Sequence, residues 1–349
     1  MKKVLLAFLL LGLNACSSDD DSKSAGDYQV QVTTGMHQKL LSEVKALHAA
    51  AVDLQAAAPE TTDRGWSASE DGKAIESMTQ AWLRARSAYE RTEGALAPLF
   101  PDIDAAIDAR YEDFLEALGA EGDTDLFDDQ GVTGMHAIER ILFANDMPGS
   151  VITVEETLPG YVPATWPETA EEAAEFKEKL AAQLVKDTAR LESQWTPQRI
   201  DLAGAFGGLI SLMNEQREKV NKAASEEEES RYAQRTMADI RDNLAGTRAI
   251  YQLFSAWVKS KDGGAALDAE VEDAFDQLEE IYATVDGDAF PAPPATWSSE
   301  DPSPADLDTP FGKLFTTVHD AVDPNKPGSA VDAMNRVATL LGFPEYQEE

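Results

Sequence analysis

The sequence predicts an all-α fold made of two successive helical bundles. From about Tyr28 onward, apolar residues recur at the spacing of a helix, and no segment alternates convincingly between apolar and polar residues. A proline-rich stretch at residues 147–167 interrupts this pattern near the middle of the chain. We therefore expect an N-terminal bundle at residues 28–146 and a C-terminal bundle at residues 168–349, joined by this connection.

Prolines, glycines and changes in apolar spacing divide the predicted bundles into helical segments. The first bundle is expected to contain helices at residues 35–58, 73–97, 103–118 and 132–145. The second is expected to contain helices at residues 168–195, 202–224, 229–259, 267–285 and 311–342, the last broken at 323–329. Pro197, Gly263–Gly264 and the proline-rich residues 290–310 separate these later helices. The acidic run Glu226–Glu229 fits the solvated start of a helix, because like charges so close together resist burial.

The net charge of the chain argues against partners that are themselves strongly negative. It has 349 residues, of which 43% are hydrophobic, enough for one large core or two of ordinary domain size. Its formal net charge of -35 repels phosphate backbones and other polyanions and concentrates cations near the surface. We therefore expect no nucleic-acid partner.

The N-terminus predicts export and lipid attachment. Residues 1–16 combine two lysines with an apolar run and a small residue before Cys16, which is the pattern of a signal peptide. The ending Leu-Asn-Ala-Cys resembles the lipobox of bacterial lipoproteins, in which Cys16 becomes the lipidated first residue of the mature chain. The alternative is an ordinary secretory signal with a chance cysteine. We expect a protein anchored in the periplasm or at the cell surface, and Ser17 favours the outer membrane in a Gram-negative host.

The residues after Cys16 carry no chemistry of their own. Residues 17–27 are polar and without periodicity, which predicts a flexible tether between lipid and fold. Cys16 is the only cysteine, so the chain forms neither an internal disulfide nor a thiolate metal site.

A histidine and a glutamate one helical turn apart form the first candidate site. In the stretch TGMHAIERIL, residues 133–142, His136 and Glu139 are three residues apart, so on a helix both can reach one ion. They lie on a different side of that helix from its apolar stripe, which predicts a helix covered on two faces. The letters TGMH also occur at residues 34–37, but His37 has no glutamate one turn on and is expected to be an ordinary polar residue.

The second candidate is the stretch WLRARSAYERTEGAL, residues 82–96. Its apolar residues form a helical stripe, and Glu90 and Glu93 lie at or near the core-facing side with Arg86 beside them. A buried carboxylate must be paired with a cation or must hold a metal. One interpretation is a simple Arg86–Glu90 ion pair on the helix surface. The other is that both glutamates are oxygen ligands of a metal, which Arg86 orients from outside the ligand set.

The third candidate is the stretch PDIDAAIDARYEDF, residues 101–114. Asp104 and Asp108 share one helix face four residues apart, which is destabilising for two like charges unless a cation lies near them. Asp102, which follows a proline, is expected to be a helix cap.

Taken in order, these segments resemble the imelysin-like family, in particular its periplasmic EfeO- and EfeM-type iron-uptake proteins. The matching pieces are ARSAYERTE, LFPDIDAAIDAR, GMHAIERILF and, in the second half, RYAQRTMADIRDNLAGTRAIY, so the likeness spans roughly residues 35–343. The resemblance implies two helical bundles in pseudo-repeat, with a metal site in the first bundle built around a Gly-x-His-x-x-Glu motif. By this resemblance the metal ligands fall on His136, Glu139, Glu90, Glu93 and Asp108.

The second half departs from the pattern of these relatives. Gln234 stands where the EfeO pattern has a histidine, and Thr236 and Ala245 replace acidic positions. At these positions the resemblance gives no support for a second metal site in the C-terminal bundle.

Three functions are compatible with these residues. The favoured one is a lipid-anchored, non-enzymatic binder of a divalent or trivalent metal that serves a membrane iron-transport system, because oxygen ligands with one imidazole suit iron, manganese or zinc. Iron is expected before zinc. The second is a metallopeptidase, but Arg140 stands where the zinc motif His-x-x-Glu-His needs its second histidine. The third is a binder of another ligand, such as a polysaccharide, between the two bundles.

Overall fold

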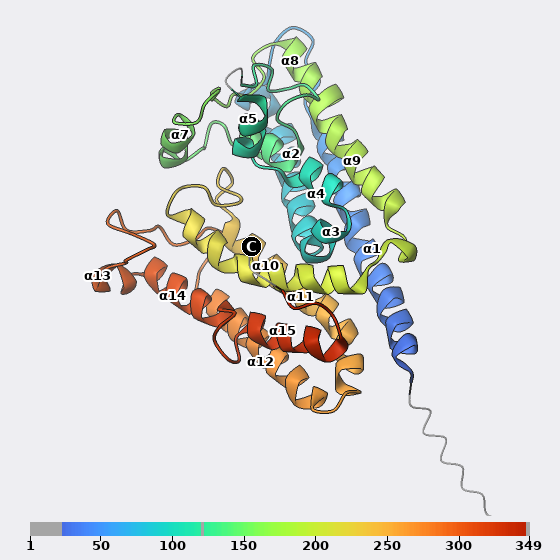
Figure 1. Ribbon diagram of the computed structural model, residues 1–349. Coiled ribbons are helices and arrows are strands. Elements are labelled where there is room, and N and C mark those ends of the chain that lie inside the picture. Colours follow the sequence, from blue (N-terminus) through green and yellow to red (C-terminus); the bar gives the residue numbers. More distant parts are fainter. Residues whose placement is uncertain (1–22, 120–121, 347–349) are drawn as a thin grey trace, which may run out of the picture.

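All regular structure in the described part of the protein is helical (Figure 1). The computed structural model describes residues 23–119 and 122–346, and no strand occurs among them. The predicted all-α class is confirmed, whereas the pseudo-repeat stays a prediction. The predicted signal peptide, Cys16 and residues 17–22 of the predicted tether lie outside the described residues. Within the described ranges, every helix is too short or too polar to cross a membrane.

Each predicted helical segment exists, although several are divided. The helices of the first half are α1 (Ala25–Ala57), α2 (Ala68–Glu90), α3 (Glu93–Leu99), α4 (Pro101–Asp108), α5 (Tyr111–Leu118), α6 (Gly134–Leu142) and α7 (Gly149–Glu155). They are followed by α8 (Ala170–Glu175), the π-helical turn η2 (Phe176–Leu180), α9 (Ala181–Gln194) and the 3-10 turn η3 (Pro197–Arg199). The remaining helices are α10 (Leu202–Ala223), α11 (Thr236–Lys259), α12 (Gly264–Tyr282), α13 (Pro304–Leu307), α14 (Pro310–Val322) and α15 (Ala330–Leu341). The short helices α7 and α13 were not expected.

The long helix α1 begins earlier than predicted. The hydroxyl of Ser24 accepts a hydrogen bond from the backbone of Asp27, whose carboxylate accepts one from the backbone of Ser24. This capping box starts the helix at Ala25, within the predicted tether and ten residues before the expected start at residue 35. One face of α1 is buried against α2 and α9, and it also contacts α11 (Figure 1).

The segment that was expected to open the C-terminal bundle packs with the first-half helices instead. Helix α9 lies against α1, α4 and α6, whereas α10, α11, α12, α14 and α15 pack mostly on one another (Figure 1). The backbone nitrogen of Trp66 donates to the carbonyl of Pro167, and its ring packs edge-on against Phe176 with centroids 4.7 Å apart. These contacts tie the segment to the connection between α1 and α2. We infer that the division between the two groups falls near residues 195–201, and not at 147–167.

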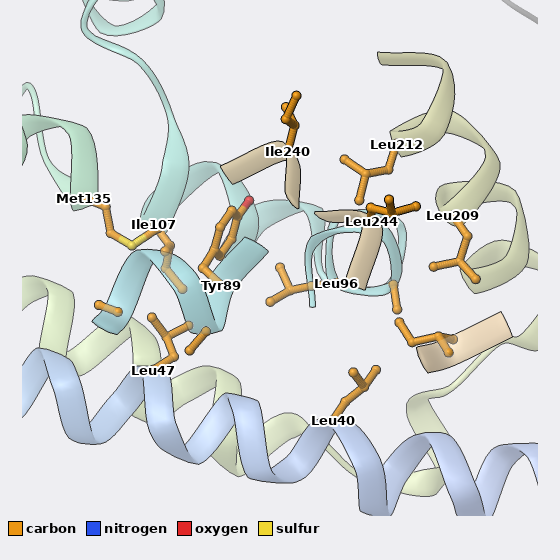
Figure 2. Close-up of a cluster of buried hydrophobic side chains, with 14 of the residues drawn as sticks. Leu40, Leu47, Tyr89, Leu96, Ile107, Met135, Leu209, Leu212, Ile240 and Leu244 are labelled. Atoms are coloured by element: carbon orange, nitrogen blue, oxygen red, sulfur yellow. The ribbon is translucent and has the colours of Figure 1, made fainter. Parts of the chain in front are cut away.

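The two groups of helices share one continuous hydrophobic core. Helix α10 packs on α3, and α11 packs on both α1 and α2. Figure 2 shows where they meet, with Leu40 and Leu47 from α1, Tyr89 from α2, Leu96 from α3, Leu209 and Leu212 from α10, and Ile240 and Leu244 from α11. Side chains from both halves of the chain can therefore reach a common site.

The corner between α2 and α3 divides the helix predicted at residues 73–97. At this corner the hydroxyl of Thr92 donates to the carbonyl oxygen of Tyr89, at 2.8 Å. Helix α11 crosses so closely that a Cβ atom on Gly246 would lie 2.3 Å from the carbonyl oxygen of Arg91. The corner places Glu90 and Glu93 on its two sides, each within reach of α11.

The start of α6 is fixed by a glycine. Gly134 has a φ of 84°, and a Cβ atom there would lie 2.7 Å from the carbonyl oxygen of Ile107. The first residue of α6 therefore touches the last turn of α4. This contact brings His136 beside Asp108.

The acidic run Glu226–Glu229 lies in the segment between α10 and α11 and does not start a helix. A solvated helix start at Glu226–Glu229 is wrong, because α11 begins at Thr236 and Glu228 and Glu229 are only 6% and 5% exposed. Glu229 is buried because Arg86 and Lys219 pair with its carboxylate.

The same segment folds back through strained backbone positions. Glu226 and Gln234 have φ angles of 60° and 51°, which are uncommon for residues other than glycine. Such strain persists only where the surroundings hold it, and it often accompanies functional sites. At these two positions the segment between α10 and α11 turns, and it contacts Glu139 on α6.

Candidate metal centre

Arg86 lies at the centre of a buried polar cluster. Its side chain is fully buried and its guanidinium contacts the carboxylates of Glu90 and Asp108. It also lies 3.0 Å from Glu229 and 3.6 Å from Asp239. We define the polar cluster as Arg86 and the residues joined to it directly or through one another, namely Glu90, Glu93, Asp108, His136, Glu139, Lys219, Glu229, Asp239 and Asn243.

His136 and Glu139 occupy one end of the polar cluster. The Nδ1 atom of His136 lies 2.9 Å from Glu139 Oε2, and its Nε2 atom lies 3.4 Å from Asp108 Oδ1. The other oxygen of Glu139 accepts hydrogen bonds from the backbone nitrogens of Tyr232 and Ala233, at 3.1 and 2.9 Å. The motif on α6 is therefore held by the segment that precedes α11.

Glu90, Glu93 and Glu229 form the other end. One carboxylate oxygen of each lies within 4.8 Å of the others. The amide nitrogen of Asn243 donates to Glu90 Oε2 at 2.5 Å and to Glu93 Oε2 at 2.7 Å. The ammonium of Lys219 lies 2.5 Å from Glu229 Oε2 and 3.4 Å from Glu93 Oε2.

Burial perturbs the carboxyl groups of this end. It raises the pKa of Glu90 well above its usual range, with Arg86 opposing and Glu93 adding to the shift. Burial likewise raises the pKa of Glu93 to about 7, although Lys219 opposes the rise. Burial also acts to raise the pKa of Glu229, but Lys219 and Arg86 outweigh it and hold that pKa well below its usual range.

At the histidine end of the polar cluster, neighbouring charges outweigh burial in setting the pKa values. Burial and the charge of Arg86 act to lower the pKa of His136, but its contacts with Asp108 and Glu139 outweigh them and raise it to about 9. For Asp108, burial acts to raise the pKa, yet Arg86 and His136 bring it below its usual range. Without a metal, the two residues therefore hold each other as an ion pair.

The polar cluster contains more negative than positive groups. Its carboxylates are Glu90, Glu93, Asp108, Glu139, Glu229 and Asp239. The permanent cations that face them are Arg86, Lys219 and Arg235. With protonated His136 as a fourth cation, six ionised carboxylates less four cations leave two excess negative charges. A further cation would relieve this repulsion.

The residues fit a metal ion by chemistry and by unsatisfied atoms. Glu90 Oε1, Glu229 Oε2 and His136 Nε2 are buried without a hydrogen bond of good geometry, although each has a charged neighbour. Carboxylate oxygens with one imidazole nitrogen are suitable ligands for iron, manganese or zinc. Within residues 23–119 and 122–346, Glu90, Glu93 and Glu229 are the one group of three such side chains close enough for a common ion.

The structure brings all five residues of the predicted ligand set into this one cluster. They do not form one equivalent set. Arg86 lies between His136 and Glu139 on one side and Glu90, Glu93 and Glu229 on the other. Arg86 pairs directly with Glu90 and Asp108, as a residue that orients the ligands from outside the ligand set would. His37 lies elsewhere, with its Nε2 atom 3.1 Å from the carbonyl oxygen of Trp195.

Only part of the third candidate segment lies near the polar cluster. Asp104 lies beside the cluster and accepts a hydrogen bond from the hydroxyl of Tyr89 at 2.6 Å. Burial raises the pKa of Asp104 to about 7, and the charge of Asp108 adds to the shift. Asp102 is exposed in the first turn of α4 and is not its cap, because Phe100 occupies that position.

Four residues of the polar cluster were missed from the sequence. They are Lys219, Glu229, Asp239 and Asn243. Asp239 and Asn243 are four residues apart on the buried face of α11, and polar residues so placed on an apolar face are a usable signal. Glu229 gives no such signal, because it lies outside any helix.

Two of the three departures in the second half, Thr236 and Gln234, have structural roles. The hydroxyl of Thr236 accepts a hydrogen bond from the backbone of Ser230, at 3.1 Å, and the amide of Gln234 donates to the carbonyl of Arg231, at 2.7 Å. Both contacts shape the segment that covers Glu139.

Comparison with known proteins identifies the family. A family sequence model described as imelysin matches residues 33–307. The chain belongs to the imelysin family. The matched region includes every residue of the polar cluster, and the same model carries the name Peptidase_M75.

Several imelysin relatives have names connected with iron. An Efem/EfeO family lipoprotein from Staphylococcus haemolyticus is 27% identical over 296 residues, which cover 83% of this chain and 88% of the relative. The iron uptake system component EfeM from Pseudomonas syringae pv. syringae is 25% identical over 61% of this chain, and EfeO from Escherichia coli is 26% identical over 61%. The aligned part makes up 61% of that EfeM and 46% of that EfeO.

The fold of this imelysin chain has a solved counterpart. The crystal structure of an imelysin-like protein from Psychrobacter arcticum matches it with a TM-score of 0.54 and 14% sequence identity. The match covers 93% of this chain and 98% of that protein, so the two share a fold over nearly their whole length.

Proposed function

We propose that this protein binds a metal ion as cargo in the polar cluster and presents it to an iron-uptake system in the membrane. The observation that carries the proposal is the meeting of His136, Glu139, Glu90, Glu93 and Asp108 in one buried cluster with an excess of carboxylates. Glu229 joins this set as a further ligand candidate. Burial of so many acidic groups is unfavourable unless cations accompany them.

Iron is the favoured cargo, and zinc is possible. The names of the relatives point to iron, since EfeM and EfeO are described as components of an iron uptake system. The oxygen-rich ligand set agrees, because it suits a divalent or trivalent ion and not Cu(I). Binding requires a neutral imidazole, so the ion must displace the proton that His136 otherwise holds.

The role we propose is non-enzymatic. A zinc metallopeptidase with this motif would need a second histidine directly after Glu139 to complete its metal ligands, and this chain has none there. Arg140, which stands at the position of the missing second histidine, donates to Glu155 Oε2 at 3.0 Å. These features support binding over hydrolysis, and the family name Peptidase_M75 keeps the peptidase as the alternative.

The metal site is tested by measuring bound metal and thermal stability. Adding iron or zinc should raise the melting temperature of the purified protein but not of His136→Ala or Glu93→Ala, because a ligand stabilises the state that binds it. His37→Ala is the matched control, since His37 shares the letters TGMH but contacts Trp195 outside the cluster. Equal shifts in all four proteins would place the metal elsewhere. Release of peptides from a casein substrate by the metal-loaded protein would favour the peptidase.

We also propose that Cys16 anchors the protein by lipid in the periplasm or at the cell surface. The lipobox-like sequence supports this, as does the name of the lipoprotein relative from Staphylococcus haemolyticus. Cell fractionation should find the parent in the membrane and Cys16→Ser released from it. Unchanged attachment of the variant would refute the anchor.

A further inference from the structure

Lys219 occupies the place between the carboxylates that a bound cation would need. Its side chain is 5% exposed, and its ammonium lies 2.5 Å from Glu229 Oε2 and 3.4 Å from Glu93 Oε2. It also donates to Asn243 Oδ1 at 3.1 Å. Glu93 and Glu229 both belong to the group of three glutamates that could hold an ion.

A metal ion and this ammonium would compete for the same oxygen atoms. Glu229 Oε2 is close to Lys219 yet lacks a hydrogen bond of good geometry, so the lysine neutralises the carboxylate without satisfying it well. We propose that the Lys219 ammonium occupies the metal position in the metal-free protein and that an incoming ion displaces it. This competition lowers the affinity of the site for metal. The inference rests on the proposed function, because it concerns the same site.

Arg86 and Lys219, the two cations that pair with Glu229, differ in their freedom to move. Arg86 is fully buried and paired with carboxylates from α2, α4 and the segment before α11. A planar guanidinium held on several sides is fixed, whereas a lysine has a flexible stem and a compact charge. Lys219 is therefore the cation that can leave, while Arg86 stays as part of the site.

The structure offers a place to which the lysine can move. A hollow of about 380 Å³ between α3 and α10 is lined by Glu93, Ser211, Glu215 and Tyr346, among others. Glu215 lies one helical turn before Lys219 on α10, so the ammonium can exchange one carboxylate for another by rotating its side chain. The same hollow gives an incoming ion a route to Glu93.

This arrangement sets a balance between capture and release. With Lys219 in place, the metal-free cluster is partly neutralised, which limits carboxylate repulsion. The ion must displace the ammonium, which weakens binding, and the ammonium returns when the ion leaves. A protein that hands its cargo to a transporter benefits from such reversible binding.

The test is the zinc affinity of Lys219→Gln, measured by isothermal titration calorimetry on the whole protein. The amide keeps polar contacts but removes the competing charge, so the dissociation constant should fall at least tenfold. Lys222→Gln is the matched control, since Lys222 is on the same helix, pairs with Glu218 and is 33% exposed. Equal or weaker binding by Lys219→Gln would overturn the proposal.

A structure of the parent protein with zinc provides a second test that does not depend on how the variant folds. Movement of the ammonium away from Glu229 supports the proposal, and an unmoved lysine beside bound zinc overturns it. If the parent binds neither zinc nor iron, the proposed function itself fails. Binding by the parent without a gain in Lys219→Gln removes only this inference.

Discussion

Arg86 shows how one side chain can decide whether a set of acidic residues is tolerated inside a protein. Its guanidinium reaches carboxylates from α2, α4, α11 and the segment before α11, and no part of the side chain is exposed. Its pKa is raised well above the usual value even though burial opposes this, because four carboxylates surround it. The charge is therefore permanent, and the fold depends on it.

Replacing Arg86 with leucine should lower the free energy of unfolding by about 3 kcal/mol or more, because it leaves buried carboxylates without their cation. Arg84→Leu on the same helix should change it by less than about 1 kcal/mol, since the Arg84–Asp53 pair is 55% and 64% exposed. Urea unfolding of both variants measures the difference. Similar losses in the two would mean that the ion pairs of Arg86 contribute little.

At the scale of elements, the glycine that opens α6 joins two helices into one half of the site. Gly134→Ala would meet both an unfavourable positive φ and the carbonyl oxygen of Ile107, so we expect a loss of about 2 kcal/mol or more. Gly149→Ala at the start of α7 is the control, because a Cβ atom there has no neighbour within 4 Å. Its effect should stay within about 0.5 kcal/mol by thermal or urea unfolding. A neutral Gly134→Ala would show that α6 can shift away from α4 without cost.

The elements also show what sequence reasoning can and cannot supply. The presence of each long helix follows from its apolar spacing, and Ser24 and Asp27 explain the start of α1 locally. The corner at Arg91–Thr92 has no comparable local signal, since the backbone of α11 approaches it at Gly246, far along the chain. The same limit applies to α9, whose packing on α1 depends on contacts between distant residues.

The candidate site was predictable to the extent that its residues recur in a family motif. His136, Glu139, Glu90, Glu93 and Asp108 were named from the sequence and lie together in the structure. Of their charged partners only Arg86 was named, because Lys219 and Glu229 resemble ordinary surface charges until their surroundings are known. Local periodicity does not reveal which charged residues are covered by another part of the chain.

At the scale of the whole molecule, the buried acids predict how stability changes with pH. Glu93 and Asp104 have pKa values raised to about 7, and His136 has one raised to about 9. Each group binds its proton more tightly in the folded state than in the unfolded state. Each contribution is therefore complete below the unfolded pKa and is lost as the pH rises through the folded one.

We accordingly expect the metal-free protein to be less stable at about pH 8.5 than at about pH 5.5. Urea unfolding in the presence of a chelator measures this, and Glu93→Gln and Asp104→Asn should each reduce the difference. The opposite contributions of Asp108 and Glu229, whose pKa values are lowered, are lost only in more acidic solution. Stability that rises with pH across this range would contradict the assignment.

The polar cluster also links the function to the order in which the chain can fold. Asn243 and Glu90, which are hydrogen-bonded in the cluster, are 153 residues apart in sequence, and Ala233 reaches Glu139 across 94 residues. Contacts of such high sequence separation carry a large chain-closure entropy and form late in folding. The proposed ligands of the first half are thus held by Asn243 and Ala233, and joined by Glu229, only after the second half of the chain has docked on the first. If the proposed site binds metal, a newly made chain would have an incomplete site until that moment, and metal binding would report that the two halves have docked.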